Sequence, residues 1–265
     1  MPYTDFYLFE DPAEPQLKIW RYMDFEKFIS LLERKEVFFC RADRFSDPYE
    51  GSYPRKEIEA RASNYKRERG FFGQTPSVEE TTKHLKDREA FNEQFRSLNV
   101  INCWHYNRTE SDAMWQLYLK SSDGVAVQST FTKLKNSFSG YDKPVYAGKV
   151  RYLNYDTDIF YSKKDFPHYQ TNTFIPLIHK RNAFIHEQEY RVMTEVDQKG
   201  WKHDWDNSES KNGKFIPADL DTLIEKIILS PNCSPQFQDQ VNALVKKHGH
   251  AFVVEKSKLN EPPQF

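Results

Sequence analysis

Short stretches of alternating apolar and polar residues recur along this chain, separated by segments with helical spacing. The stretch LKIWRYM at 17–23 alternates and predicts a strand. An apolar repeat of three and four residues follows at 24–35 and predicts a helix with Asp24 at its N-cap. Further strands are predicted at 37–42, 100–106, 123–130, 143–153 and 251–257, and further helices at 112–120, 169–188 and 235–249.

About seven short strands with local helices predict one α+β domain over residues 16–260. We expect a mixed or split β-sheet flanked by helices. Residues 54–98 are charged and helix-prone, with Gly70 and Gly73 between two helical segments, and they predict a helical insertion that is a candidate lid or specificity element. Residues 1–15 are acidic and punctuated by proline, which predicts a flexible arm.

Composition narrows the class of protein. The net charge of -1 argues against a general polyanion binder, although the basic segment 55–69 can supply a local basic groove. Three cysteines without a CxxC pair indicate reduced thiols. The N-terminus has no signal-peptide pattern, and no apolar run approaches the roughly 18 residues of a membrane span. We therefore expect a cytoplasmic protein that does not enter a membrane.

The stretch FIHEQEYRVM at 184–193 carries the strongest candidate chemistry. Glu187, Glu189 and Arg191 stand at every second position, so in a strand they line one face, while Tyr190 lies on the other. Lys180 is expected on the preceding helix. A fixed pair of carboxylates can stabilise an oxocarbenium-like centre. Alternatively, the acids and bases form a structural ion network or a solvated Glu–Arg ladder.

Arg21 stands in the middle of the first strand, on its apolar face. A buried guanidinium needs an acid or a phosphate, and Glu189 or a dinucleotide are the natural candidates. A structural Arg–Glu bridge is the alternative.

The loop RADRFSDPYEG at 41–51 offers Arg41, Arg44, Asp47 and Glu50 where a strand ends, which suits either a site or plain turn capping. Cys103 and His105 share a strand face, but two soft ligands are too few for zinc, so no metal site is predicted. The chain also lacks the glycine-rich phosphate loops and the HExxH motif.

Four stretches taken together resemble one bacterial domain family of unknown function. They are residues 17–51, with a Phe-x-Asp-Pro-aromatic-Glu loop, residues 103–130, with a Met-Trp-x-x-Tyr helix, residues 179–193, with Glu-x-Glu-aromatic-Arg, and IILSPNC at 227–233. The resemblance implies a cytoplasmic prokaryotic or phage protein, whose relatives often lie near mobile or defence genes.

The chain also resembles ADP-ribosyltransferases. The features that carry this resemblance are a strand with a Trp-Arg pair, a helix directly after it, a Gly-led strand ending in Ser-Thr and a late Glu-x-Glu. This resemblance implies NAD as substrate. Arg21 would hold its phosphate or ribose, Ser129 would stand for the middle serine, Glu189 would bind the nicotinamide ribose, and Glu187 would orient the acceptor. Tyr22 or Tyr190 would stack on the nicotinamide. The middle motif departs from the family, since it reads Gln128-Ser129-Thr130.

Three hypotheses follow. The first is an ADP-ribosyltransferase or NAD glycohydrolase, a toxin or phage-defence effector that acts on nucleic acid or protein and has an antitoxin or defence partner. The second is a non-catalytic domain that binds a nucleotide or nucleic acid through Arg21, Arg41, Lys180 and Arg191. The third is a magnesium-dependent nuclease using Asp47, Glu50, Glu187 and Glu189.

Overall fold

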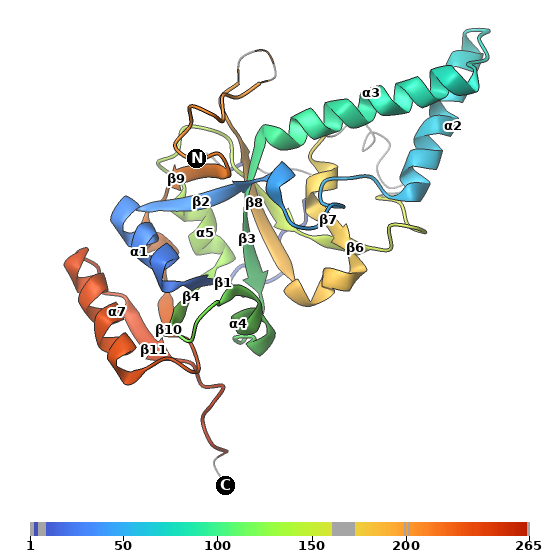
Figure 1. The fold of residues 1–265 in the computed structure, drawn as a ribbon. Coiled ribbons are helices and arrows are strands. Elements are labelled where there is room, and N and C mark those ends of the chain that lie inside the picture. The colour runs from blue at the N-terminus through green and yellow to red at the C-terminus, as the bar shows by residue number, and fades with distance from the viewer. Residues whose placement is uncertain (1–2, 5–8, 161–172, 199, 201, 264–265) are drawn as a thin grey trace.

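A nine-stranded mixed β-sheet forms the centre of the molecule in a computed structural model that describes residues 3–4, 9–160, 173–198, 200 and 202–263 (Figure 1). Its strands are β1 (Lys18–Asp24), β2 (Glu36–Arg41), β3 (Asn99–Tyr106), β4 (Gly124–Thr130), β5 (Tyr146–Lys149), β8 (Glu189–Glu195), β9 (Gly213–Pro217), β10 (Lys226–Leu229) and β11 (Val253–Lys256). They run in the order β11-β10-β4-β1-β3-β2-β9, while β8 pairs with β3 and β5. The pairing of β10 with β11 is parallel and the other pairings of this sheet are antiparallel.

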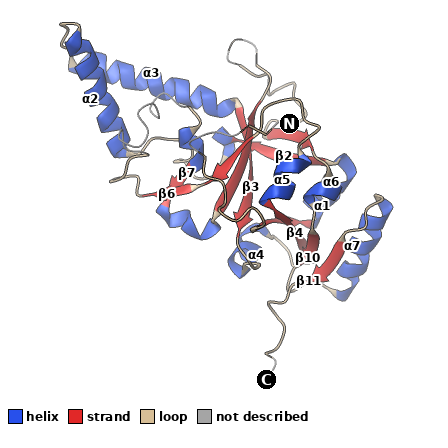
Figure 2. Cartoon of the chain, turned by 180° about the vertical axis from the view of Figure 1, so that it is seen from behind, coloured by secondary structure: helices blue, strands red, loops and turns tan. Residues whose placement is uncertain are grey.

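Helices cover both faces of the sheet. The main apolar core lies under α1 (Phe25–Arg34), α5 (Phe131–Ser137), α6 (Leu220–Leu223) and α7 (Pro235–Lys247), and Figure 2 shows α5 and α6 side by side. On the other face, α4 (Asp112–Tyr118) packs Met114 and Trp115 against Trp20 and Tyr22 of β1. The expected α+β domain with flanking helices is therefore confirmed.

Two long helices project from the body, α2 (Arg55–Phe71) and α3 (Val78–Ser97) (Figure 1). Ser77 caps α3 in a capping box with Glu80, which fixes where that helix begins. Phe71 and Phe72 are exposed near the turn between the helices. These helices confirm the predicted insertion at 54–98, and its function as a lid stays a prediction.

Two predicted elements were wrong. Residues 143–153 form β5 and a separate strand β6 (Arg151–Leu153) instead of one bulged strand. Residues 169–188 were expected to be mainly helical, and 169–172 lie outside the described residues. The remainder holds the 3₁₀ turn η3 (Ile175–Ile178), strand β7 (His179–Arg181), which pairs with β6, and the 3₁₀ turn η4 (Asn182–Glu187). Apolar spacing of three is shared by α- and 3₁₀-turns, and Pro176 at the start of η3 limits helix growth.

The N-terminal segment contacts the body where it is described. Tyr3 bridges to Val145, the Thr4 N–H donates to the Val145 carbonyl, and Phe9 is buried. No helix in the described part of the chain is long and apolar enough to cross a membrane.

Candidate active site in a split β-sheet

A split in the sheet creates the main cavity. One edge of β3 pairs with β8 along its length, but its other edge is shared by two strands. Strand β1 pairs with Tyr106 and His105 at one end, and β2 pairs with Ile101 and Val100 at the other end. Among the described strands, none therefore lies beside residues 102–104 on this edge. A cavity of about 610 Å³ lies at the split, bordered by β1, β2, β3, α1 and α4.

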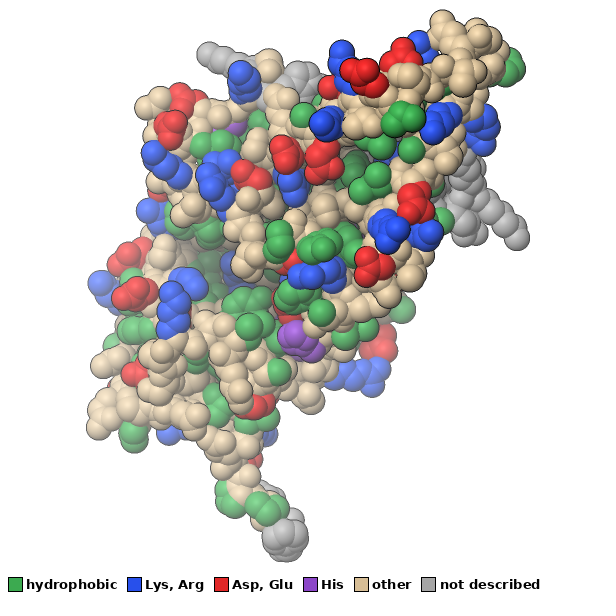
Figure 3. Space-filling view, turned by 45° about the vertical axis from the view of Figure 1, so that its right-hand side comes forward, with side chains coloured by type: hydrophobic (Ala, Val, Ile, Leu, Met, Phe, Trp, Pro, Cys, Tyr) green, Lys and Arg blue, Asp and Glu red, His purple; other side chains and the backbone are tan. Residues whose placement is uncertain are grey.

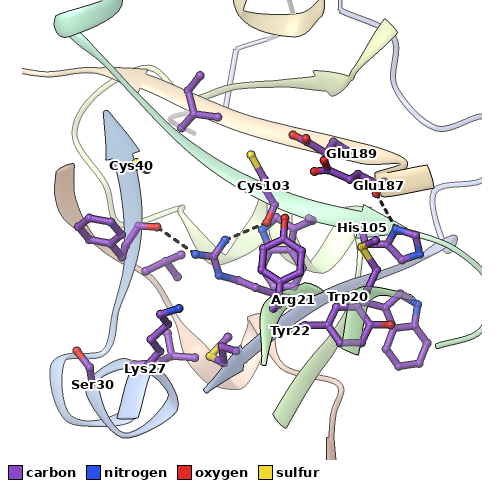
Figure 4. A pocket seen from close by; sticks show the side chains of 18 of the residues that line it. Trp20, Arg21, Tyr22, Lys27, Ser30, Cys40, Cys103, His105, Glu187 and Glu189 are labelled. Atoms are coloured by element: carbon purple, nitrogen blue, oxygen red, sulfur yellow. Dashed lines mark hydrogen bonds between the residues drawn. The ribbon is translucent and has the colours of Figure 1, made fainter. Parts of the chain in front are cut away.

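Arg21 crosses the split from β1. Its side chain shares a strand face with the core residues Ile19 and Met23, as expected. Its Nη1 donates to the Cys103 carbonyl at 2.9 Å and its Nη2 to the Phe38 carbonyl at 3.4 Å (Figure 4). In a continuous β-ladder these two carbonyls would accept backbone N–H groups, and here the guanidinium donates to them instead.

Arg21 has no carboxylate partner among the residues that the structure describes, so the predicted bridge to Glu189 was wrong. Burial lowers the pKa of Arg21 from its usual value, because it disfavours the charged form. A guanidinium has five N–H donors, and the two carbonyls use only two of them. Arg21 therefore presents a cation with donors to spare at the wall of the cavity.

Glu187 and Glu189 line the same cavity, on a different wall from Arg21 (Figure 4). Lys180 donates to both oxygens of Glu187 at 3.0 Å and to Oε1 of Glu189 at 2.7 Å. Arg191 donates through Nε to Oε2 of Glu189 at 2.7 Å, and its two terminal nitrogens hold Glu50 at 2.9 Å. This buried network of three acids and two bases carries a formal charge of about -1 when all five groups are ionised.

The network shifts the pKa values of Glu187 and Glu189 in opposite directions. Burial, together with the charge of Glu189, raises the pKa of Glu187 to about 7. Burial alone would also raise the pKa of Glu189, but Arg191 and Lys180 outweigh it and lower that pKa below its usual value. Glu189 therefore stays ionised, while Glu187 exchanges a proton near neutral pH.

The backbone around the two acids differs from the predicted continuous strand. Strand β8 begins at Glu189, whereas Glu187 ends η4 and Gln188 between them adopts a left-handed conformation with φ 39°. The Nδ1 of His105 lies 2.7 Å from the Glu187 carbonyl oxygen, and the Glu189 N–H donates to the Tyr152 hydroxyl at 2.8 Å. Both carboxylates still reach Lys180 because the left-handed residue redirects the chain.

Lys180 lies on β7 and not on a helix, which corrects the expected position. From there its ammonium group reaches both Glu187 and Glu189. Neither Lys180 nor Arg191 lines the cavity, so both act from behind the carboxylates.

Two other predicted ligand-binding residues lie away from the cavity. The Ser129 hydroxyl is fully buried and donates to the Leu223 carbonyl at 2.5 Å. Tyr190 packs in the main core, on the face of β8 opposite to Glu189, and its hydroxyl donates to Asp11 at 3.2 Å. Tyr22 does line the cavity, with its hydroxyl accepting the Ser111 N–H at 2.9 Å.

Aromatic rings form much of the cavity wall, and the sequence assigned no site role to most of them. They are Trp20, Tyr22, Phe38, Phe45, Trp104, Tyr118 and Phe215. Tyr118 had a recognisable signal, because it stands four residues after Met114 on α4 and both side chains line the cavity.

The loop at 41–51 ties into the same region through ion pairs. Asp47 accepts from Arg181 at 2.7 Å and Glu50 from Arg191, which fixes the loop to β7 and β8. In the part of the chain that the structure describes, no group of three His, Cys, Asp or Glu side chains is arranged to hold a metal ion. The four carboxylates of the magnesium-dependent nuclease hypothesis already accept hydrogen bonds from Lys or Arg side chains.

Comparisons with protein-family models, with curated proteins and with solved structures gave no match. Both resemblances described above therefore stay predictions, and function is inferred from the cavity's own residues.

Proposed function

We propose that this chain is an ADP-ribosyltransferase-like enzyme that cleaves NAD and transfers ADP-ribose to a nucleic-acid or protein acceptor. One observation carries the proposal: Arg21, a cation without an acid partner in the described part of the chain, lines the same cavity as the carboxylates Glu187 and Glu189. The cavity volume of about 610 Å³ falls within the range of small-molecule sites. A dinucleotide offers a phosphate to the arginine and a ribose to the acids.

Arg21 supports binding of the substrate. Its unused N–H donors suit phosphate oxygens, because a planar guanidinium donates pairs of parallel hydrogen bonds. The two carbonyls that it already contacts hold its side chain across the split. The phosphate would therefore meet a cation that is already oriented.

Glu189 and Glu187 have different roles in the proposed reaction. The bond between the ribose carbon and the nicotinamide nitrogen breaks, and its electron pair leaves with nicotinamide. The ionised Glu189 stabilises the positive charge that develops on the ribose. The acceptor's nucleophilic atom then bonds to the ribose carbon and loses its proton to Glu187, whose pKa of about 7 suits a general base.

Purified protein incubated with labelled NAD and cell lysate tests this proposal. We expect nicotinamide release and labelled product from the wild type, and a loss of at least about 100-fold in kcat for Glu189→Gln. Glu195→Gln, on the same strand but outside the cavity, is the matched control and should turn over normally. Thermal unfolding of each variant separates lost chemistry from lost folding. No NAD consumption, no labelled product and no NAD-induced thermal shift in the wild type would overturn the proposal.

A second candidate function is binding of a nucleotide or nucleic acid without catalysis. One observation favours it: both oxygens of Glu189 are already held, one by Lys180 and one by Arg191. Lys and Arg side chains are interspersed with Asp and Glu over the face shown in Figure 3, which favours a nucleotide over a long polyanion. Binding that is retained in Glu189→Gln, without NAD turnover in either protein, would support this candidate.

A further inference from the structure

Tyr118 occupies a distinct position at the cavity. It is the last residue of α4, and its side chain lines the cavity while the residue remains 39% exposed. The chain turns to an extended conformation at Leu119 directly afterwards. The ring therefore lies where the cavity meets the surface, on a helix that the buried Met114 and Trp115 hold against β1.

The hydroxyl group of Tyr118 has no hydrogen-bond partner among the described residues, although charged groups surround it. Its electrostatic neighbours include Glu187, Glu189 and Lys180 on one side, and the Arg21 guanidinium also interacts with it. Partial burial of Tyr118, together with the negative charges of Glu189 and Glu187, raises its pKa above the usual value, so the phenol keeps its proton at physiological pH. The group is therefore a hydrogen-bond donor at the cavity, within electrostatic range of Arg21 and of both carboxylates.

The carboxylates of Glu187 and Glu189, which line the cavity, already accept hydrogen bonds from other side chains. Each oxygen of Glu187 and Glu189 accepts a hydrogen bond from Lys180 or Arg191. The other tyrosine hydroxyl of the cavity wall, that of Tyr22, is engaged with the Ser111 N–H. An anion held by Arg21 would give the Tyr118 hydroxyl a charged acceptor, and such hydrogen bonds are stronger than neutral ones.

We infer that Tyr118 is a ligand-binding residue whose hydroxyl donates to the phosphate group that Arg21 holds. The site therefore takes a phosphate-bearing nucleotide in preference to the corresponding nucleoside. The inference rests on the proposed function for the choice of an adenine dinucleotide as ligand. The aromatic ring of Tyr118 contributes apolar contact to either class of ligand, so ring and hydroxyl have separable effects.

Calorimetric titration of the full chain with ADP-ribose and with adenosine tests the inference, since neither probe is consumed. Tyr118→Phe should bind ADP-ribose about tenfold more weakly than wild type, close to 1.4 kcal/mol, and adenosine equally well. Tyr118→Ala should weaken both probes, because the ring is lost. Tyr106→Phe, which removes a hydroxyl outside the cavity, should match the wild type. Circular dichroism verifies that each variant is folded.

The outcomes separate this inference from the proposed reaction. Unchanged ADP-ribose affinity in Tyr118→Phe, an equal loss for adenosine, or no binding of ADP-ribose by the wild type would overturn the inference. Tyr118-dependent binding of ADP-ribose without NAD consumption would leave the inference standing and remove the enzymatic function. NAD turnover whose KM and kcat are both unchanged in Tyr118→Phe would overturn the inference and leave the enzymatic function standing.

Discussion

The Nδ1 nitrogen of His105 lies 2.7 Å from the main-chain oxygen of Glu187. A carbonyl can only accept, so Nδ1 carries the proton and Nε2 carries none in the neutral ring. Burial lowers the pKa of His105 even though the bond to Glu187 favours protonation, and the ring is therefore neutral at pH 7. The bond joins β3 to the end of η4 and fixes the backbone of Glu187 beside the left-handed Gln188.

Replacement of His105 by the two amide residues should have opposite results. Asparagine places an N–H donor near the position of Nδ1, whereas glutamine places it near Nε2. His105→Asn should keep NAD turnover within a few-fold of wild type. His105→Gln should lose at least about tenfold in kcat and about 1–2 kcal/mol of unfolding free energy, because the Glu187 carbonyl is left without its donor. Steady-state kinetics and urea unfolding measure both, and equal behaviour of the two variants would contradict this positioning role.

The fold class could be predicted from sequence because the strands and helices near the cavity carry clear local patterns. The alternation at 17–23 and the helical stripe after Asp24 correspond to β1 and α1. The segment around Lys180 could not be predicted in this way. Its apolar residues are spaced like those of a helix, yet its conformation is set by a buried ion network whose partner Glu50 stands more than 100 residues earlier in the chain.

The candidate site was predictable in part. Period-two spacing placed Glu189 and Arg191 on one face, and the apolar register of β1 singled out Arg21. The split was not predictable, because it depends on where β1 and β2 pair along β3, and pairing register is a tertiary property. Ser129 shows the same limit. Its sequence context fits a binding serine, but its hydroxyl donates to the Leu223 carbonyl.

Removal of the buried guanidinium of Arg191 should be strongly destabilising. Arg191 is 1% exposed and neutralises both Glu50 and Glu189, so Arg191→Met leaves two buried carboxylates with fewer partners. We expect a loss of about 3–5 kcal/mol in urea unfolding at pH 7. The double variant Arg191→Met with Glu50→Gln should lose less than the sum of the single losses, because one uncompensated charge is also removed. Additive losses would show that the two residues are not coupled.

The stability contribution of Glu187 should fall as the pH rises. Burial and the charge of Glu189 raise the pKa of Glu187 from 4.5 to about 7 in the folded protein. The folded state therefore holds a proton that the unfolded chain releases between these values. The resulting stabilisation is complete below pH 4.5 and is lost as the pH rises through 7, by roughly 3 kcal/mol in total.

Glu187→Gln isolates this effect, since glutamine resembles the protonated acid at every pH. Its unfolding free energy should be close to that of wild type at pH 4 and should exceed it increasingly up to pH 8. Chemical denaturation across this range measures the difference, with Glu33→Gln on the exposed face of α1 as the control. A difference that is constant with pH would show that Glu187 titrates at an ordinary pKa.

Ser129→Ala should affect stability without affecting ligand binding. The hydroxyl is buried and donates to the Leu223 carbonyl, and it lies outside the cavity. Its removal leaves that carbonyl short of a donor and should cost about 1–2 kcal/mol in urea unfolding. ADP-ribose affinity should remain within about twofold of wild type. A large loss of affinity with unchanged stability would instead support the role that the resemblance to ADP-ribosyltransferases implies for this serine.

His179 should make the protein sensitive to acid. Burial lowers its pKa from 6.5 to about 3, although the contact with the Ile175 carbonyl favours protonation. Below pH 6.5 the unfolded chain therefore binds a proton at His179, while the folded protein does not bind it until the pH approaches 3. The stability present above pH 6.5 is lost as the pH falls towards 3. The loss at pH 4 should be roughly 3 kcal/mol relative to pH 7.5.

His179→Asn keeps a donor for the Ile175 carbonyl but cannot become charged, so its unfolding free energy should vary less between pH 7.5 and 4 despite the lost ring packing. A slope in His179→Asn as steep as that of wild type would contradict the assignment.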